Sequence, residues 1–161
     1  MILIALGANL PSPAGPPTAT LRAALARLEE QGVKILSVSS FYETPAWPNP
    51  AQPAFVNAVA AVESTLQPVE LLTLLHGVET DFERLRSAPN APRTLDIDLL
   101  DYDGKRMTDG VMLPHPRMAE RSFVLVPLAQ VAPNWRHPVT GEAVGDLLVR
   151  LPDREVPQPL K

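Results

Sequence analysis

Hydrophobic residues recur along this chain with two different periods, which predicts a mixture of strands and helices. A continuous apolar run at 2–6 and the alternating segments at 33–43 and 54–64 predict three strands. Apolar residues spaced by three or four predict helices over 18–31 and from about 67 to 85. The order of these five segments is strand, helix, strand, strand, helix.

Both predicted helices carry their own boundary signals. Gly32 stands where a helix commonly ends, and Pro68 stands in the tolerated first turn of the second helix. The apolar stripe of the first helix is Leu21, Leu25 and Leu28, and that of the second is Leu71, Leu75, Val78, Phe82 and Leu85. Each stripe predicts that one helix face packs on a common core.

The segment 92–104, PRTLDIDLLDYDG, alternates as a further strand but carries acids within it. Leu95, Ile97 and Leu99 share one side of the pattern, whereas Asp96 and Asp98 share the other side with Leu100. Asp101 and Asp103 stand near the following turn and are expected to be turn residues.

The remaining C-terminal segments predict smaller elements. A short strand is expected near 105–113, a helix over 122–133 with Ser122 as N-cap, a hairpin around 137–144 and a helix at 145–150. The order β-α-β-β-α-β predicts one α+β domain over 1–161, a ferredoxin-like sandwich with a mainly antiparallel sheet and additional C-terminal elements.

Composition narrows the class of protein. The chain has no cysteine, which excludes disulfides and thiolate chemistry, and its first apolar run is too short for a signal peptide or membrane span. A net charge of −4 argues against a nucleic-acid partner. We therefore expect a cytoplasmic, monomeric protein with small-molecule partners. Its 19 prolines lie mainly between periodic segments and predict stiffened loops.

The pair of acids carries the first candidate chemistry. Residues two apart on a strand lie roughly 7 Å apart on one face, so Asp96 and Asp98 present two carboxylates together. Paired carboxylates suit Mg²⁺, which completes its shell with water and phosphate oxygens, and Arg93 adds a cation suited to phosphate. The alternative is a solvated strand face or protection of a sheet edge.

Because no glycine-rich phosphate loop is present, cationic side chains would have to hold phosphates. The segments that flank the acids supply Arg84, Arg86, His115, Arg117 and Arg121.

A second group of residues suits a flat heterocycle. Phe55 and Asn57 share a strand face, so a ring for stacking lies beside an amide that both donates and accepts. The alternative is a core phenylalanine beside an asparagine that bonds a neighbouring backbone. His76 and Glu79 lie one turn apart on the polar side of the second helix, where an exposed helix pair is the simpler interpretation.

Taken together, these segments resemble the 6-hydroxymethyl-7,8-dihydropterin pyrophosphokinase family of folate biosynthesis. The resemblance covers about the first 135 residues, and its most specific motifs are APRTLDIDLL at 91–100 and PHPRMAERSF at 114–123. It implies transfer of pyrophosphate from ATP to the pterin hydroxymethyl group, with release of AMP and with two Mg²⁺ ions. The rival hypotheses are a ligand-sensing module without catalysis and an RNA-binding sheet, the latter disfavoured by acidity and few aromatic residues.

The resemblance also implies roles for individual positions. Asp96 and Asp98 would hold the metal ions, and Arg84 and Arg93 would assist catalysis. Around ATP it places His76, Glu79, Arg86, Arg93, His115 and Arg121. Around the pterin it places Thr44, Phe55, Asn57 and Phe123, with Asn9 near that pocket. The chain departs from the family at PNAPR, 89–93, which lacks a tryptophan that many members have there, and Trp47 is the residue that would compensate.

Overall fold

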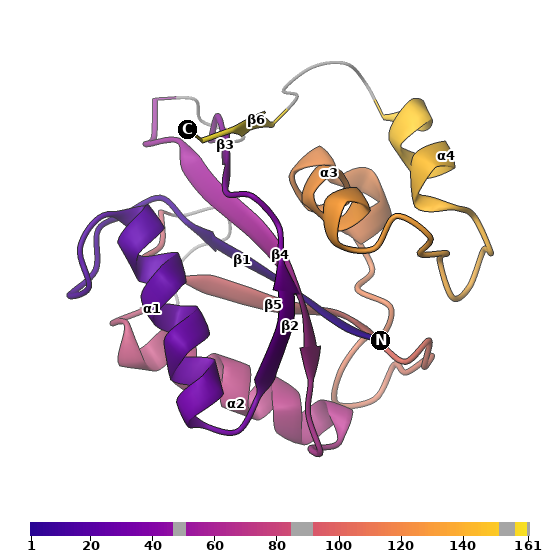
Figure 1. Cartoon of the computed structure of the whole chain (residues 1–161), viewed down its shortest axis with the longest axis horizontal. Coiled ribbons are helices and arrows are strands. Elements are labelled where there is room, and N and C mark those ends of the chain that lie inside the picture. The colour runs from indigo at the N-terminus through magenta and orange to yellow at the C-terminus, as the bar shows by residue number, and fades with distance from the viewer. Residues whose placement is uncertain (47–50, 85–91, 152–156, 161) are drawn as a thin grey trace.

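The computed structural model describes residues 1–46, 51–84, 92–151 and 157–160. Its centre is an antiparallel sheet in which β1 (Ile2–Ala8) lies between β4 (Phe55–Glu63) and β5 (Asp96–Tyr102) (Figure 1). The far side of β4 pairs with the remaining strands, β2 (Lys34–Val38) and β3 (Tyr42–Thr44), and β6 (Gln158–Pro159) pairs with β3. This strand order confirms the α+β fold that the order of segments predicted.

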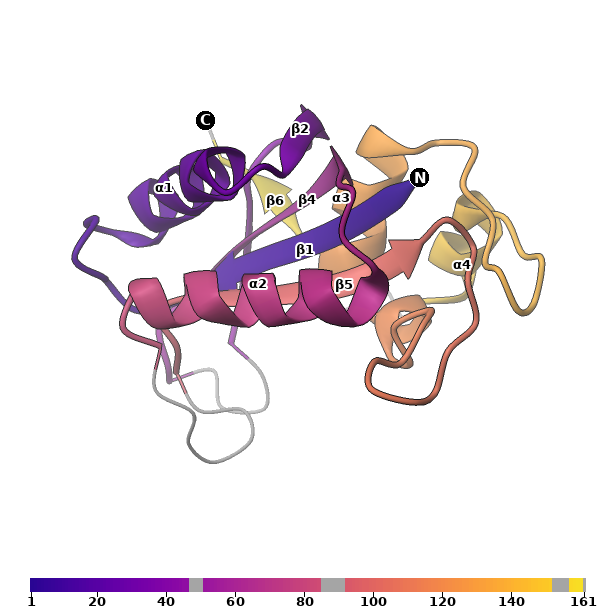
Figure 2. The same ribbon diagram turned by 90° about the horizontal axis from the view of Figure 1, so that it is seen from below.

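Helices cover the two faces of the sheet unequally. Along one face run α1 (Pro17–Glu30) and α2 (Pro68–Asp81), as Figure 2 shows. Their buried leucines and valines pack with inward residues of β1, β4 and β5 into the larger core. Against the other face lie α3 (Ser122–Val131) and α4 (Val144–Arg150), which form a second core.

Local sequence explains why the first two helices begin and end where they do. Gly32 has a φ of +89°, and the Val33 N–H donates to the Leu28 carbonyl at 3.0 Å, so the chain turns sharply after α1. At the start of α2, the side chains of Gln67 and Glu70 form a reciprocal capping box. These signals hold the helices in the positions that cover the first face.

The structure departs from several predicted boundaries. The segment 33–43 is two short strands, because the ladder breaks at Ser39, whose hydroxyl accepts the Val59 N–H. A register shift also interrupts β2 itself after Ile35. The second helix ends at Asp81 rather than near 85, since Glu83 adopts a φ of +64° that a helix cannot continue through. Leu85, the last residue of the predicted stripe, lies outside the described residues.

The C-terminal elements also differ in detail from the predictions. Ser122 is already helical, and Arg121 is the N-cap, with its carbonyl accepting the first helical N–H groups. The predicted strand at 105–113 is one isolated bridge between Met107 and Leu113, and the predicted hairpin is a single bridge as well. Strand β6 had no periodic signal, because two residues are too few to show one. Among the described residues, no helix is long and apolar enough to cross a membrane.

Side chains on the second face change from large to small or polar along each central strand. On β1 the outward positions are Leu3, Ala5 and Gly7, of which Leu3 belongs to the second core. On β5 the corresponding residues are Leu100, which is buried in the same core, and then Asp98 and Asp96. Helix α3 therefore packs on the apolar end of this face, and the other end remains open.

Candidate active site

A cavity of about 410 Å³ occupies the open end of the second face. One half is lined by small, aromatic and amide side chains, and the other half by charged ones. The first group includes Gly7, Thr44, Phe55, Asn57 and Phe123, and the second includes Arg93, Asp96, Asp98, Arg117 and Arg121. Eight of the thirteen predicted site residues therefore line this one space, and they come from both predicted groups.

The half with aromatic residues is built on β3 and β4. Asn57 and Thr44 are both buried, and the Asn57 amide donates to the Thr44 hydroxyl at 2.9 Å. Gly7, on the neighbouring strand β1, pairs with Asn57. A Cβ added to Gly7 would lie 2.7 Å from the side-chain Oδ1 of Asn57, so only glycine leaves that amide in place. Phe55 and Phe123 come from β4 and α3 and provide rings at two sides of the same cavity.

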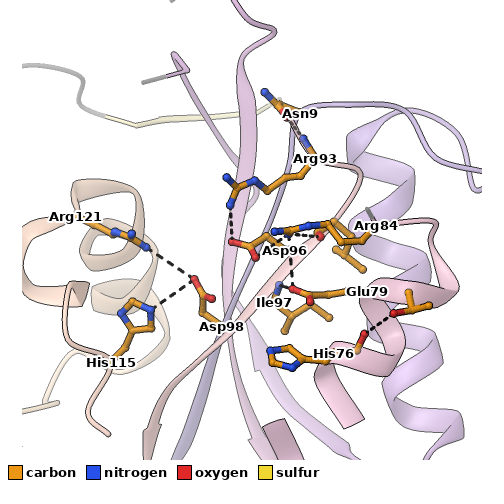
Figure 3. Close-up of polar contacts among 12 residues, drawn as sticks. Asn9, His76, Glu79, Arg84, Arg93, Asp96, Ile97, Asp98, His115 and Arg121 are labelled. Carbon is orange, nitrogen blue, oxygen red and sulfur yellow. Dashed lines mark hydrogen bonds and ion pairs between the residues drawn. The ribbon is translucent and has the colours of Figure 1, made fainter. Parts of the chain in front are cut away.

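In the charged half, Asp96 is held by two arginines (Figure 3). Arg84 donates to its Oδ1 at 3.0 Å and Arg93 donates to its Oδ2 at 3.2 Å. Burial by itself would raise the pKa of Asp96, but the charges of Arg93 and Arg84 outweigh it and hold that pKa below its usual value. Asp96 is therefore ionised and already compensated by protein cations.

Asp98, two residues further along β5, has weaker compensation. Arg121 Nη1 and His115 Nε2 each lie 3.9 Å from its Oδ2. Burial, with the charge of Asp96 as the second cause, raises the pKa of Asp98 to about 6. A cation bound here would offset the cost of ionising Asp98. The two acids therefore differ in how far the protein's own cations compensate their charge.

His115 faces Asp98 as a neutral ring. Burial, together with the nearby charge of Arg121, lowers the pKa of His115 to about 4, so the contact with Asp98 is not an ion pair near neutral pH. The His115 Nδ1 accepts the Arg117 backbone N–H at 3.2 Å. The neutral ring therefore carries its proton on Nε2, which points toward Asp98 in Figure 3 but lies 3.9 Å from its Oδ2, beyond hydrogen-bond distance.

Glu79 and His76 have different positions, although they lie one turn apart on α2. The prediction of a polar, exposed side is correct for His76 and wrong for Glu79, which is 2% exposed. Glu79 accepts the Ile97 backbone N–H at 2.8 Å, and its Oε2 lies 3.9 Å from Arg84 Nη1. Because the edge of β5 faces α2, this buried carboxylate fixes the strand that carries both acids.

Two cation–ring contacts join the halves of the cavity. The Arg93 guanidinium carbon lies 5.8 Å from the centroid of Phe55, and that of Arg121 lies 5.4 Å from the centroid of Phe123. Each arginine thus reaches from the acids toward one of the two rings. A ligand with a flat ring and a charged end fits this arrangement.

The structure also locates Arg117, one of the flanking cations named from sequence, and corrects the expectation for Asp101. Arg117 lines the cavity and is exposed, and its side chain has no ion pair or hydrogen bond within the described part of the chain. Asp101 is buried and accepts the Trp135 indole N–H at 2.8 Å as well as the turn bond from Gly104, so it is more than a turn residue. Arg86 and Trp47 lie outside the described residues.

The donor set fits a hard divalent cation with few protein ligands. Among the described residues, no group of three or more histidine, aspartate or glutamate side chains is arranged to hold a metal. Two carboxylates on one strand face are what Mg²⁺ uses when phosphate oxygens and water supply its other ligands. The incomplete compensation of Asp98 agrees with such an ion.

Comparison with known proteins places this chain in a class of phosphate-transferring enzymes. The profile of the 7,8-dihydro-6-hydroxymethylpterin-pyrophosphokinase (HPPK) family matches residues 3–133. The 2-amino-4-hydroxy-6-hydroxymethyldihydropteridine pyrophosphokinase of Pseudomonas aeruginosa is 38% identical over 153 residues, covering 94% of this chain and 91% of the relative. That of Synechocystis sp. is 36% identical, covering 91% and 73%.

Longer proteins contain a similar unit. The Pneumocystis carinii folic acid synthesis protein fol1 is 33% identical over 96% of this chain, which spans 20% of that protein. The Plasmodium falciparum HPPK-DHPS crystal structure matches with a TM-score of 0.71 at 14% identity, covering 92% of this chain and 40% of the other. At that identity the match shows the fold alone. The chain belongs to the HPPK family, and it is an ATP-dependent pyrophosphokinase of folate biosynthesis.

Proposed function

We propose that Asp96 and Asp98 bind two Mg²⁺ ions together with the triphosphate of ATP, and that the adjoining half of the cavity binds the dihydropterin. The observation that carries this proposal is the unequal compensation of the two acids. Arg84 and Arg93 already neutralise Asp96, whereas Asp98 has no cation closer than 3.9 Å in the described residues. When bound, the metal ions would offset phosphate charge and make the attacking hydroxyl more acidic.

The chain's own residues then serve mainly to position two substrates. The amide of Asn57, held by Thr44, is suited to the edge of the heterocycle, and Phe55 and Phe123 are suited to its faces. In the reaction, the hydroxymethyl oxygen bonds to the β-phosphorus and its proton passes to solvent water. The bond from that phosphorus to the oxygen of AMP breaks, and AMP leaves. Correct alignment of these two bonds supplies much of the catalysis.

Cationic side chains would stabilise the charge on the transferred group. Arg84, Arg93 and Arg121 lie on two sides of the acids, and neutral His115 offers an N–H donor. Exposed His76 is proposed to contact ATP. For Glu79 we propose support of β5 and Arg84 instead of contact with the nucleotide, because its carboxylate is buried. Arg86 keeps its proposed role near ATP as a prediction from the family resemblance.

Metal counting tests this proposal directly. With a non-hydrolysable ATP analogue present, titration of Mn²⁺ followed by electron paramagnetic resonance is expected to give two bound ions per chain. Asp98→Asn is expected to weaken that binding strongly, whereas Asp103→Asn, an exposed turn residue outside the cavity, is the matched control. A wild-type stoichiometry of one or none, or unchanged binding in Asp98→Asn, would contradict the assignment.

Monomeric state and cytoplasmic location stay predictions from sequence.

A further inference from the structure

Asn9 is a buried amide that does not line the cavity yet bonds to two segments that do. It follows the C-terminal end of β1 and is 2% exposed. Its Oδ1 accepts the Arg93 backbone N–H at 2.8 Å, and its Nδ2 donates to the Pro53 carbonyl at 3.1 Å. Figure 3 shows Asn9 directly behind Arg93 as seen from the acids. One side chain therefore joins two segments 40 residues apart in sequence.

The main chain around Asn9 reinforces this connection. The N–H groups of Asn9 and Leu10 both donate to the Arg93 carbonyl, each at 3.1 Å. Together with the bond to the Asn9 side chain, both backbone polar groups of Arg93 are bonded to the end of β1. The main-chain position of Arg93 is thus set by a central strand of the sheet.

Each bonded segment carries a residue of one half of the site. Arg93 reaches Asp96 with its guanidinium, and Pro53 stands two residues before Phe55. The same guanidinium lies over the Phe55 ring. Asn9 therefore spans the two segments whose side chains meet at the junction between the charged half and the aromatic half.

We propose that Asn9 is a positioning residue that sets the place of Arg93 relative to the acids and the place of Phe55 relative to the heterocycle. The inference rests on the proposed roles of Arg93 and Phe55. Its bond to Arg93 acts on turnover, since misplacing a charge-stabilising group by a fraction of an ångström slows the chemical step. Its bond to Pro53 acts on pterin binding.

A double-mutant cycle tests whether Asn9 acts through Arg93. We expect Asn9→Ala to lower kcat about tenfold in the wild-type background and to have little further effect on kcat in Arg93→Ala, because the group being positioned is then absent. The KM for the pterin is expected to rise by a similar factor in both backgrounds. A purely structural role would instead lower kcat by the same factor in both, and that result would overturn the proposal.

The conservative variant separates the two bonds. Asn9→Asp keeps an acceptor for the Arg93 N–H but cannot donate to the Pro53 carbonyl. We expect it to recover most of kcat while keeping the raised KM for the pterin, and it serves as the test variant if Asn9→Ala does not fold. Equal kcat for the two variants, well below wild type, would contradict the assignment of the Arg93 bond.

Controls distinguish this proposal from the proposed function. Asn134→Ala removes an exposed amide outside the cavity and should leave both constants unchanged. Absence of AMP formation by the wild type would contradict the function itself. Calorimetric binding of the pterin does not depend on turnover, so unchanged affinity in Asn9→Ala would still overturn the role assigned to the Pro53 bond.

Discussion

The two faces of the sheet use the same three central strands for opposite purposes. Toward α1 and α2, the inward residues of β1, β4 and β5 are apolar along their length and are almost fully buried. Toward α3, the same strands are apolar at one end only and then present Gly7, Asn57 and two aspartates. The site therefore lies where the second core ends, on strands whose opposite face is completely packed. The packed opposite face therefore gives the site its rigidity.

The largest effect is expected from removing the acids on the open face. Asp96→Asn and Asp98→Asn should each lower turnover about 1,000-fold or more. Each removes a carboxylate that is proposed to hold the Mg²⁺ ions, and these ions offset the charge of the phosphates. AMP formation measured at saturating ATP and Mg²⁺ checks this, with Asp103→Asn as the control that should match wild type. Near-normal activity in either variant would show that the open face is not where chemistry occurs.

A change on the covered face should have the reverse pattern. Leu75 is fully buried between α2 and the sheet, so Leu75→Ala is expected to lower the free energy of unfolding by about 2–5 kcal/mol. Urea denaturation measures the loss, and Val149→Ala, at an 84% exposed position, is the control. Below its melting temperature, the Leu75→Ala protein should keep kcat within about twofold of wild type. A large fall in kcat in folded protein would show that the two faces are not separable.

A smaller effect is expected at Arg117, the exposed arginine of the open face. Arg117→Gln should raise the KM for ATP about three- to tenfold and leave the KM for the pterin unchanged, since a single exposed charge–phosphate contact is modest. Arg106→Gln, outside the cavity, is the matched control. Equal KM values for ATP in wild type and Arg117→Gln would remove Arg117 from the site.

The smallest effect concerns stability without ligands. Burial raises the folded-state pKa of Asp98 to about 6, above the usual value for an aspartate, so its ionised form costs stability at neutral pH. That cost is full above about pH 6 and disappears as pH falls to about 4. In EDTA, Asp98→Asn should therefore melt a few degrees above wild type at pH 7 and at the same temperature near pH 4.

Mg²⁺ with an ATP analogue should reverse this order at pH 7, because only the wild type then gains the full binding energy. Differential scanning fluorimetry at both pH values, with and without metal, covers all conditions. A lower melting temperature for Asp98→Asn in EDTA would mean that Asp98 is stabilising, as Asp96 is expected to be through its two arginines.

Much of this arrangement was predictable from sequence because it follows from short-range periodicity. The alternation at 95–100 placed Asp96 and Asp98 together and Leu100 with them, and the structure confirms that face. The burial of Glu79 was not predictable, since it depends on where α2 lies beside the edge of β5. Likewise, no local pattern indicates that Asp101 pairs with Trp135, 34 residues away, or that Asn9 bonds Arg93.

The close approach of Gly7 to Asn57 has a consequence for how this protein can evolve. Any larger side chain at position 7 would displace an amide that Thr44 holds, so variation there would damage the pocket rather than reshape it. An inhibitor that rests on the bare backbone of Gly7 would therefore contact a position with no easy route to resistance. Drug-escape variants should arise instead at the exposed rim, where Arg117 stands.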